Sequence, residues 1–194
     1  MVMVGSNLFV GGLFTDAGSA TRNFIARWSG SAWFSLGTGM NDYVYTLAVI
    51  GSDLYAGGEF TTAGGNSANY IARWNGTTWN TLGTGTSDYV YAMHVVSTNL
   101  YVGGAFTDAG GSTVNRIARW NGSTWSALGN GFGNGVVYGI ASMGSDIYAG
   151  GTFTSSGILT INRIARWNGS VWAELEEGAN STVRVVTLAG TNLY

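Results

Sequence analysis

The sequence predicts an all-β protein of the β-propeller class, in which four successive repeats each fold into a four-stranded blade. The first observation is the tetrapeptide Ile-Ala-Arg-Trp, which occurs four times at spacings of 46, 46 and 47 residues. The second is that each repeat contains four short runs rich in β-branched and aromatic residues, separated by turn residues. Four strands in about 46 residues correspond to one propeller blade.

The strands are clearest in the third repeat, where we expect them over residues 89–96, 99–102, 116–120 and 124–128. Helices do not fit, because Gly accounts for 32 of the 194 residues and interrupts every window of helical length. The third and fourth runs are joined by Asn-Gly in three repeats and by Ser29-Gly30 in the first. Since these dipeptides suit positive φ angles, we expect tight hairpins at these positions.

Double glycines and paired tryptophans recur with the same period. The double glycines stand at residues 11–12, 57–58, 103–104 and 150–151. All eight Trp fall into pairs five residues apart: Trp28 and Trp33, Trp74 and Trp79, Trp120 and Trp125, and Trp167 and Trp172. A flat solenoid is the competing architecture, but its repeats usually carry one or two strands and a helix. We therefore expect radially stacked sheets with the Trp pairs in the core between blades.

We expect residues 1–194 to form a single repeat domain. The blade repeats span approximately residues 1–42, 43–88, 89–134 and 135–181, and a closing strand covers residues 182–194. The two ends overlap in repeat register, because Phe9 aligns with Tyr194. Such an overlap can close a ring within one chain or between two chains. The favoured assembly is a homodimer of eight blades, and the alternatives are a four-bladed monomer or a piece of a longer array.

An even number of blades is favoured by an alternation along the chain. The same repeat position is occupied in turn by Asn7, Asp53, Asn99 and Asp146. The residue before the recurrent Ile instead separates the first two repeats, with Phe24 and Tyr70, from the last two, with Arg116 and Arg163.

Composition and charge exclude several classes of function. The eight basic residues are all Arg, the net charge is −2 and only 9% of the residues are charged, so we expect no nucleic-acid binding. No apolar run approaches the ~18 residues of a membrane helix, so we expect no membrane insertion. The absence of Cys and the presence of one His argue against thiol chemistry and a metal centre, and we expect no cofactor.

The recurrent arginines and the one dense acidic group are candidates for an anion ring and for an enzyme site. The arginines are Arg27, Arg73, Arg119 and Arg166. No carboxylate recurs in all four repeats, so we expect these side chains to bond backbone carbonyls or to stack on Trp. The acidic group, Glu174, Glu176 and Glu177, occurs only in the last repeat and suits a solvated turn.

The candidate ligand-binding residues precede or lie on the innermost strand of each blade. They are Asp42 and Tyr43 where the first repeat meets the second, Asp88 and Tyr89 where the second meets the third, and His94. Exposed Tyr with Asp suits stacking on a sugar ring and hydrogen bonding to it, whereas the structural alternative is a turn whose Tyr covers the blade edge. His94 aligns with Ala48 and Ala141, so it is either a tolerated substitution or a functional group at the channel.

The pattern Gly-Gly-x-Phe-Thr, followed by Ile-Ala-Arg-Trp-Asn-Gly-x-x-Trp-x-x-Leu-Gly, resembles known propeller repeats. It is similar to the Kelch family, and more closely to the propeller-like repeats of fungal cortical polarity proteins and large secreted bacterial proteins. The resemblance implies an extracellular or cell-surface propeller without a common enzyme site. We therefore expect a non-enzymatic structural or protein-interaction module that binds a protein or glycan ligand, with a lectin-like carbohydrate-binding propeller as the alternative.

Overall fold

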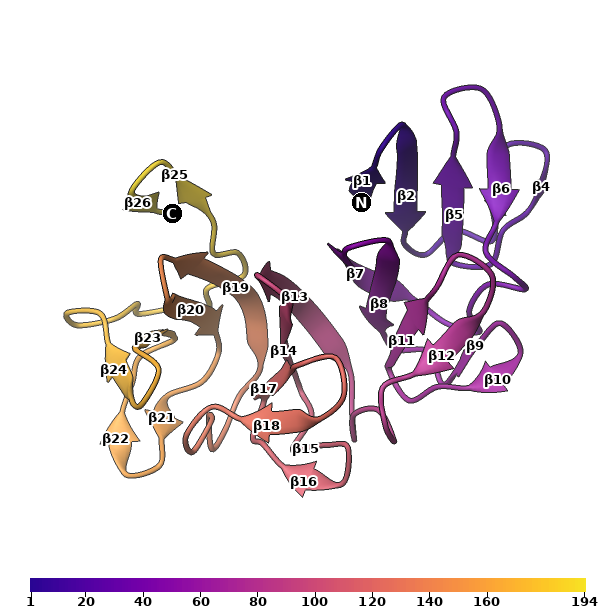
Figure 1. The fold of residues 1–194 in the computed structure, drawn as a ribbon. Coiled ribbons are helices and arrows are strands. Elements are labelled where there is room, and N and C mark those ends of the chain that lie inside the picture. The colour runs from indigo at the N-terminus through magenta and orange to yellow at the C-terminus, as the bar shows by residue number, and fades with distance from the viewer. The chain divides into compact units, whose positions relative to one another are not determined.

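The computed structural model describes residues 1–194, and all of its regular elements are β-strands (Figure 1). Four four-stranded sheets follow one another along the chain, as a β-propeller fold requires. The predicted fold class, all-β with four four-stranded blades, is therefore confirmed. The structure contains no helix that is long and apolar enough to cross a membrane.

The blades are formed by strands in a constant order. Blade 1 contains β1 (Val2–Val4), β2 (Asn7–Gly11), β5 (Ile25–Trp28) and β6 (Trp33–Ser35). Blade 2 contains β7 (Val44–Ile50), β8 (Asp53–Gly58), β11 (Ile71–Trp74) and β12 (Trp79–Thr81). Blade 3 contains β13 (Val90–Val96), β14 (Asn99–Gly104), β17 (Ile117–Trp120) and β18 (Trp125–Ala127). Blade 4 contains β19 (Val137–Met143), β20 (Asp146–Gly151), β23 (Ile164–Trp167) and β24 (Trp172–Glu174).

Each repeat also contains a small two-stranded hairpin that the sequence analysis did not predict. These hairpins are β3 (Asp16–Ala17) with β4 (Ala20–Thr21), β9 (Thr62–Ala63) with β10 (Asn66–Ser67), β15 (Asp108–Ala109) with β16 (Ser112–Thr113), and β21 (Ser155–Ser156) with β22 (Leu159–Thr160). Strands of two residues are too short to show an alternating pattern, which explains why they were missed. Each hairpin lies between the second and third strands of its blade.

The chain divides into two compact units, Met1–Val90 and Tyr91–Tyr194, here called unit 1 and unit 2. Unit 1 holds blades 1 and 2, and its core includes Ile25, Leu36 and Phe60. Unit 2 holds blades 3 and 4, and its core includes Phe132, Ile147 and Phe153. In unit 2 the rings of Phe132 and Phe153 stack with their centroids 3.8 Å apart.

The first glycine of each double glycine makes room for a valine of the next inner-strand segment. A Cβ at Gly11 would approach Val44 Cγ1 to 2.4 Å, and one at Gly103 would lie 2.5 Å from Val137 Cγ1. Real Cβ atoms do not approach other carbons so closely, so these positions require Gly. The double glycine therefore recurs with the repeat because successive blades within each unit stack through its first residue.

In each unit one tryptophan pair connects two successive blades, as predicted. Trp74 and Trp79 face each other across β11 and β12, with ring centroids 5.4 Å apart. Trp79 Nε1 donates a hydrogen bond of 2.9 Å to the Leu36 carbonyl, which follows β6 of blade 1. In unit 2, Trp172 Nε1 bonds the Leu128 carbonyl in the same way at 2.8 Å.

The hairpin turns within the blades follow the sequence prediction. The turn glycines Gly30, Gly76, Gly122 and Gly169 have φ angles between 94° and 100°. In blade 2 the Asn75 side-chain oxygen accepts hydrogen bonds from the N–H groups of Thr77 and Thr78. The Asn residues therefore serve the turn itself.

At the C-terminal end, β25 (Leu188–Ala189) pairs with β26 (Asn192–Leu193) as a two-stranded sheet of unit 2. Val183 and Val186, which precede this sheet, pack against Gly150 in the way that Val137 packs against Gly103. The C-terminal segment thus repeats the inner-strand contact of a blade.

Candidate functional site

The best-defined candidate site lies in unit 1 and is organised by two residues with left-handed backbone conformations. Phe24 and Tyr70 have φ angles of 62° and 63° and immediately precede β5 and β11. A bulky residue in this region is strained by about 1–3 kcal/mol and needs support from its surroundings. Backbone hydrogen bonds support both residues: Phe24 N–H donates to the Phe14 carbonyl, and Tyr70 N–H donates to the Phe60 carbonyl.

The two strained residues direct their rings toward the sequence-predicted tyrosines. Phe24 contacts Tyr43 with ring centroids 5.8 Å apart, and Tyr70 contacts Tyr89 at 5.6 Å. Tyr43 and Tyr89 are both half-buried. One side of each tyrosine is therefore held by packing, and the remainder is accessible.

The predicted aspartates shape the turns that carry these tyrosines. Asp42 Oδ1 accepts the N–H of Tyr43 at 2.8 Å, and Asp88 Oδ1 accepts the N–H of Tyr89 at 2.7 Å. The same geometry thus occurs in two successive repeats. Each carboxylate has a second oxygen that this backbone bond does not use.

Glu59, which the sequence analysis missed, links the two pairs. It follows β8, its N–H donates to the Tyr43 carbonyl at 2.9 Å, and its Oε1 accepts the hydroxyl of Tyr45 at 2.5 Å. The charge of Glu59 is the largest cause that raises the pKa of Tyr89, followed by desolvation and the charge of Asp88, and Asp42 contributes as well. The N–H of the preceding Gly58 donates to the Tyr70 carbonyl at 3.0 Å, and the Tyr70 ring packs on Tyr89, so Glu59 lies beside both Asp-Tyr pairs. We name Asp42, Tyr43, Glu59, Asp88 and Tyr89 the tyrosine-acid cluster.

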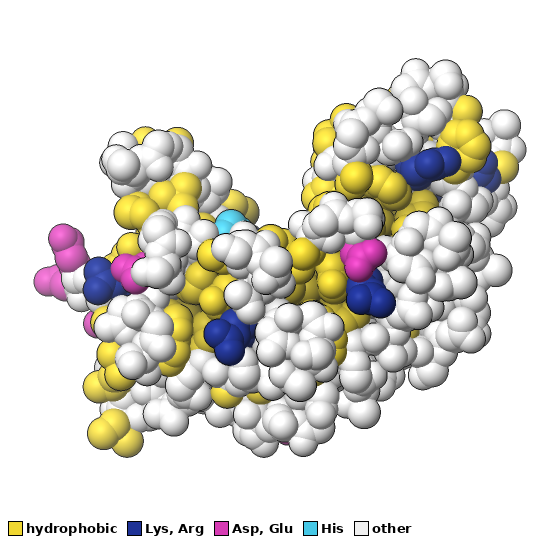
Figure 2. All heavy atoms as spheres, in the orientation of Figure 1, with side chains coloured by type: hydrophobic (Ala, Val, Ile, Leu, Met, Phe, Trp, Pro, Cys, Tyr) yellow, Lys and Arg dark blue, Asp and Glu magenta, His cyan; other side chains and the backbone are white.

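One signal in the sequence could have identified Glu59. Its equivalents in the other repeats are Leu13, Ala105 and Thr152, so it is the one charged residue at that position. Figure 2 shows that charged side chains are sparse on the face drawn, among hydrophobic and uncharged polar groups. In a chain with so few charged residues, a charged residue that occurs in one repeat only is a candidate site residue.

The corresponding positions in unit 2 have a different chemistry. Arg116 and Arg163 have φ angles of 72° and 65°, equivalent to those of Phe24 and Tyr70. Arg116 Nε donates to the Gly135 carbonyl at 2.8 Å, and Arg163 Nη1 donates to the Ala179 carbonyl at 3.0 Å. The same strained position thus holds the following loop through hydrogen bonds in unit 2 and through aromatic rings in unit 1.

His94, the remaining sequence-predicted site residue, lies on β13 in unit 2. Its Nε2 is 2.8 Å from the hydroxyl oxygen of Ser142 on β19, so it connects the inner strands of blades 3 and 4. Burial lowers the pKa of its imidazole. These contacts describe a neutral side chain engaged between two blades.

The recurrent arginines have different partners from those predicted. Arg73 and Arg166 pair with carboxylates, at 3.6 Å from Asp53 and 3.5 Å from Asp146. Arg27 lies over the ring of Phe34, and Arg119 Nε bonds the hydroxyl of Ser126 at 3.2 Å. The prediction of carbonyl or Trp partners was wrong, because the facing residue on the neighbouring strands differs from blade to blade.

In the acidic group of the last repeat, Glu174 stabilises the local backbone. Glu174 Oε1 accepts the N–H of Asn162 at 2.6 Å. Within residues 1–194, no three His, Cys, Asp or Glu side chains are grouped so that they could hold a metal ion.

Comparisons with known proteins agree with the architecture. A family model described as a domain of unknown function (DUF5122) beta-propeller matches residues 53–76 and 99–123. The two matched segments are equivalent parts of blades 2 and 3, from the second strand to the turn after the third. No curated protein matches the chain. The chain is therefore similar to a β-propeller family whose function is open.

Proposed function

We propose that this chain is a non-enzymatic β-propeller module that binds a partner protein through the tyrosine-acid cluster. The observation that carries the proposal is the position of Glu59 beside both Asp-Tyr pairs. Its N–H bonds the Tyr43 carbonyl, and the adjacent Gly58 bonds Tyr70, whose ring packs on Tyr89. The recurrent Trp and Gly residues, by contrast, are engaged in packing between blades. Binding chemistry would then be added where the repeats differ, on the loops of a rigid scaffold.

The chemistry of the cluster favours a cationic segment as the ligand. Three carboxylates attract Arg or Lys and form charge-assisted hydrogen bonds with them. The accessible part of a tyrosine ring adds cation–π attraction. A basic segment of a partner protein therefore suits this surface better than an acidic or purely apolar one.

Fluorescence anisotropy with two labelled peptides tests this proposal. The probes are Gly-Arg-Gly-Lys-Gly and its counterpart with Glu in place of the basic residues. We expect the basic probe alone to bind, and to bind at least about tenfold more weakly to D42N/D88N. Asn retains the acceptor for the N–H of Tyr43 and Tyr89, so the turns should persist in this variant.

The matched control is D16N/D53N, which removes two negative charges from unit 1 outside the cluster. Equal weakening by the two double variants would show that only net charge attracts the probe, and it would refute the assigned site. Circular dichroism of each variant establishes that the fold is retained.

A lectin-like function is the second candidate, because the same Asp-Tyr geometry is repeated in two blades. A half-buried tyrosine offers a ring face to a sugar, and the free carboxylate oxygen accepts hydroxyl hydrogen bonds. A neutral glycan that binds the wild type on a glycan array, but not Y43V/Y89V, would support this function. Val occupies the equivalent position, Val136, in the fourth repeat. An array without a binder would remove the lectin hypothesis and leave the fold untouched.

We further propose that the module acts outside the cell or at the cell surface, as the resemblance to secreted and cortical propeller repeats suggests, and that it assembles as a homodimer. The alternation along the chain supports an even number of blades, since Arg–Asp pairs occur in blades 2 and 4. Light scattering coupled to size exclusion tests the assembly. A mass near twice 20.3 kDa is expected, and a mass near 20.3 kDa would contradict the dimer.

A further inference from the structure

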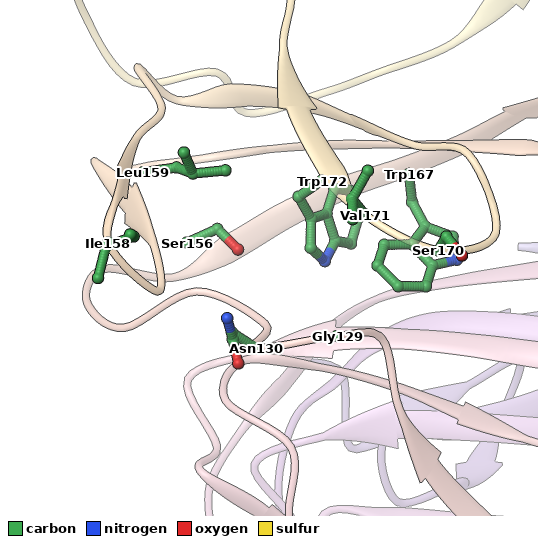
Figure 3. A pocket seen from close by; sticks show the side chains of 9 residues that line it. All are labelled: Gly129, Asn130, Ser156, Ile158, Leu159, Trp167, Ser170, Val171 and Trp172. Carbon is green, nitrogen blue, oxygen red and sulfur yellow. The ribbon is translucent and has the colours of Figure 1, made fainter.

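A second surface, in unit 2, has an apolar pocket that the tyrosine-acid cluster does not include. It has a volume of about 280 Å³ and is lined by residues of the β21–β22 hairpin, the β23–β24 hairpin and the loop at Gly129 and Asn130. Figure 3 shows these side chains surrounding the opening, with the Trp pair on one side and the hairpin residues on the other. We call it the blade-4 pocket.

The rim of this pocket exposes large apolar side chains. Ile158 is fully exposed, and Leu159 and Val171 are exposed by 50% and 56%. Ile158 aligns with Ser19, Gly65 and Gly111, and Leu159 aligns with Ala20, Asn66 and Ser112; Val171 aligns with Ala32, Thr78 and Thr124. The other repeats thus have small or polar residues at all three positions, so the fold does not require the apolar ones. Grouped exposure of large apolar side chains marks an interaction site.

The floor of the pocket is rigid and aromatic. Trp167 and Trp172 lie with ring centroids 5.5 Å apart, and the buried Trp172 is held by its bond to the Leu128 carbonyl. A Cβ at Gly129 would lie 2.9 Å from Trp167 Cζ3, so the Trp167 ring rests directly on this glycine. Such a floor is formed before any ligand arrives, and it suits a flat apolar group.

One polar group inside the pocket points to a more specific ligand. Ser156 is only 5% exposed and is one of the residues that line the pocket. In Figure 3 its oxygen is directed into the pocket, toward Trp172. The equivalent residues are Ala17, Ala63 and Ala109, so this hydroxyl is an addition of the fourth repeat. A hydroxyl in such surroundings favours a ligand atom that forms a hydrogen bond.

We propose that the blade-4 pocket receives an uncharged aromatic side chain with a hydrogen-bonding atom, Tyr or Trp, from a partner protein. No lining residue carries a charge, so a charged group would lose its hydration without compensation. The volume lies just below the ~300–1,000 Å³ typical of pockets for whole small-molecule ligands, which favours a single side chain. The exposed Ile158 and Leu159 would contact the protein surface around that side chain. The inference rests on the proposed role in protein binding, but it assigns a separate surface.

Nuclear magnetic resonance titrations of the Trp indole signals test this inference. The probes are N-acetyl-tyrosinamide, N-acetyl-phenylalaninamide and N-acetyl-lysinamide. We expect the Tyr probe to bind several-fold more tightly than the Phe probe, and the Lys probe to cause no shift. In S156A the preference for Tyr over Phe should disappear, because the hydroxyl partner is gone and Ala is the native residue of the other repeats.

The variant I158S/L159S/V171T removes the apolar rim with residues that other repeats have at the same positions. It should weaken both aromatic probes by about tenfold. The control L13T replaces an exposed leucine of unit 1 and should leave binding unchanged. D42N/D88N should also leave it unchanged, so a failure of the pocket is distinguishable from a failure of the tyrosine-acid cluster.

Three results would overturn the inference. The first is no binding of the aromatic probes to the wild type, and the second is equal binding to the wild type and the rim variant. The third is self-association of the chain that the rim variant abolishes while the probes do not bind, since the occupant would then be a second copy.

Discussion

Replacing Gly103 by Ala should destabilise unit 2 by about 2 kcal/mol, because the blades stack through this glycine. The added Cβ would lie 2.5 Å from Val137 Cγ1 and 3.0 Å from Ile140 Cδ1, whereas carbon atoms in contact prefer about 3.5–4.0 Å. Val137 is completely buried, so the required shift of about 1 Å has no free volume to use. Overpacking of this kind costs about 1–3 kcal/mol.

A double-mutant cycle with Val137→Ala isolates the contact. V137A alone removes two methyl groups from the core and should cost about 2 kcal/mol, from about 0.8 kcal/mol per group and the cavity that remains. In G103A/V137A the new Cβ occupies space that the valine has left. The loss should therefore be smaller than the sum of the single losses by about 1–2 kcal/mol.

Urea unfolding followed by Trp fluorescence measures these differences, and the melting temperature of G103A should fall by about 4–8 °C. Gly133→Ala is the matched control, since Gly133 is exposed and its added Cβ would meet only Ser155 Oγ at 3.5 Å. Losses that are additive to within about 0.5 kcal/mol would refute the reasoning, because Gly103 would then not be required by Val137.

Three further predictions follow from single contacts. W79F leaves the Leu36 carbonyl without its donor and should lower the unfolding free energy by about 1–3 kcal/mol in urea titrations. D146N removes a partly exposed pair with Arg166 and should cost less than about 1 kcal/mol, a difference that vanishes when unfolding is measured at high salt. Burial lowers the pKa of His94 in the folded chain below the unfolded value of about 6.5. As the pH decreases below about 6.5, the unfolded chain therefore binds the proton more readily, and the free energy of unfolding decreases. H94A should flatten this part of a stability–pH curve, by less than the one-proton limit of about 1.4 kcal/mol per pH unit because the ring is only half-buried.

Each of these predictions has a clear contrary result. W33F, at the equivalent but half-buried Trp of blade 1, should cost less than W79F, and equal losses would assign the effect to packing alone. A salt-independent loss in D146N would show that the carboxylate acts through something other than charge. An unchanged slope in H94A would mean that other groups cause the decline of stability at acidic pH.

The amino-acid sequence by itself determined the repeat, the four strands of each blade and the hairpin turns. These features depend on neighbours along the chain: β-branched runs form strands, and Asn-Gly forms a turn. Even the double glycine, which is explained by Val44 beside Gly11, was visible as a period because the same kind of contact recurs at each double glycine. Repetition makes such a tertiary contact apparent in one sequence.

Only the tertiary structure decided which of the residues that differ between repeats come together. Glu59 lies beside Tyr43 and Tyr45 because folding brings separate segments to one place, and no local pattern encodes that contact. The left-handed conformation of Tyr70 and the pocket beside Ser156 have the same origin. The repeated residues specify the scaffold through short-range geometry, whereas the candidate sites depend on side chains that occur once and meet only when the sheets are packed.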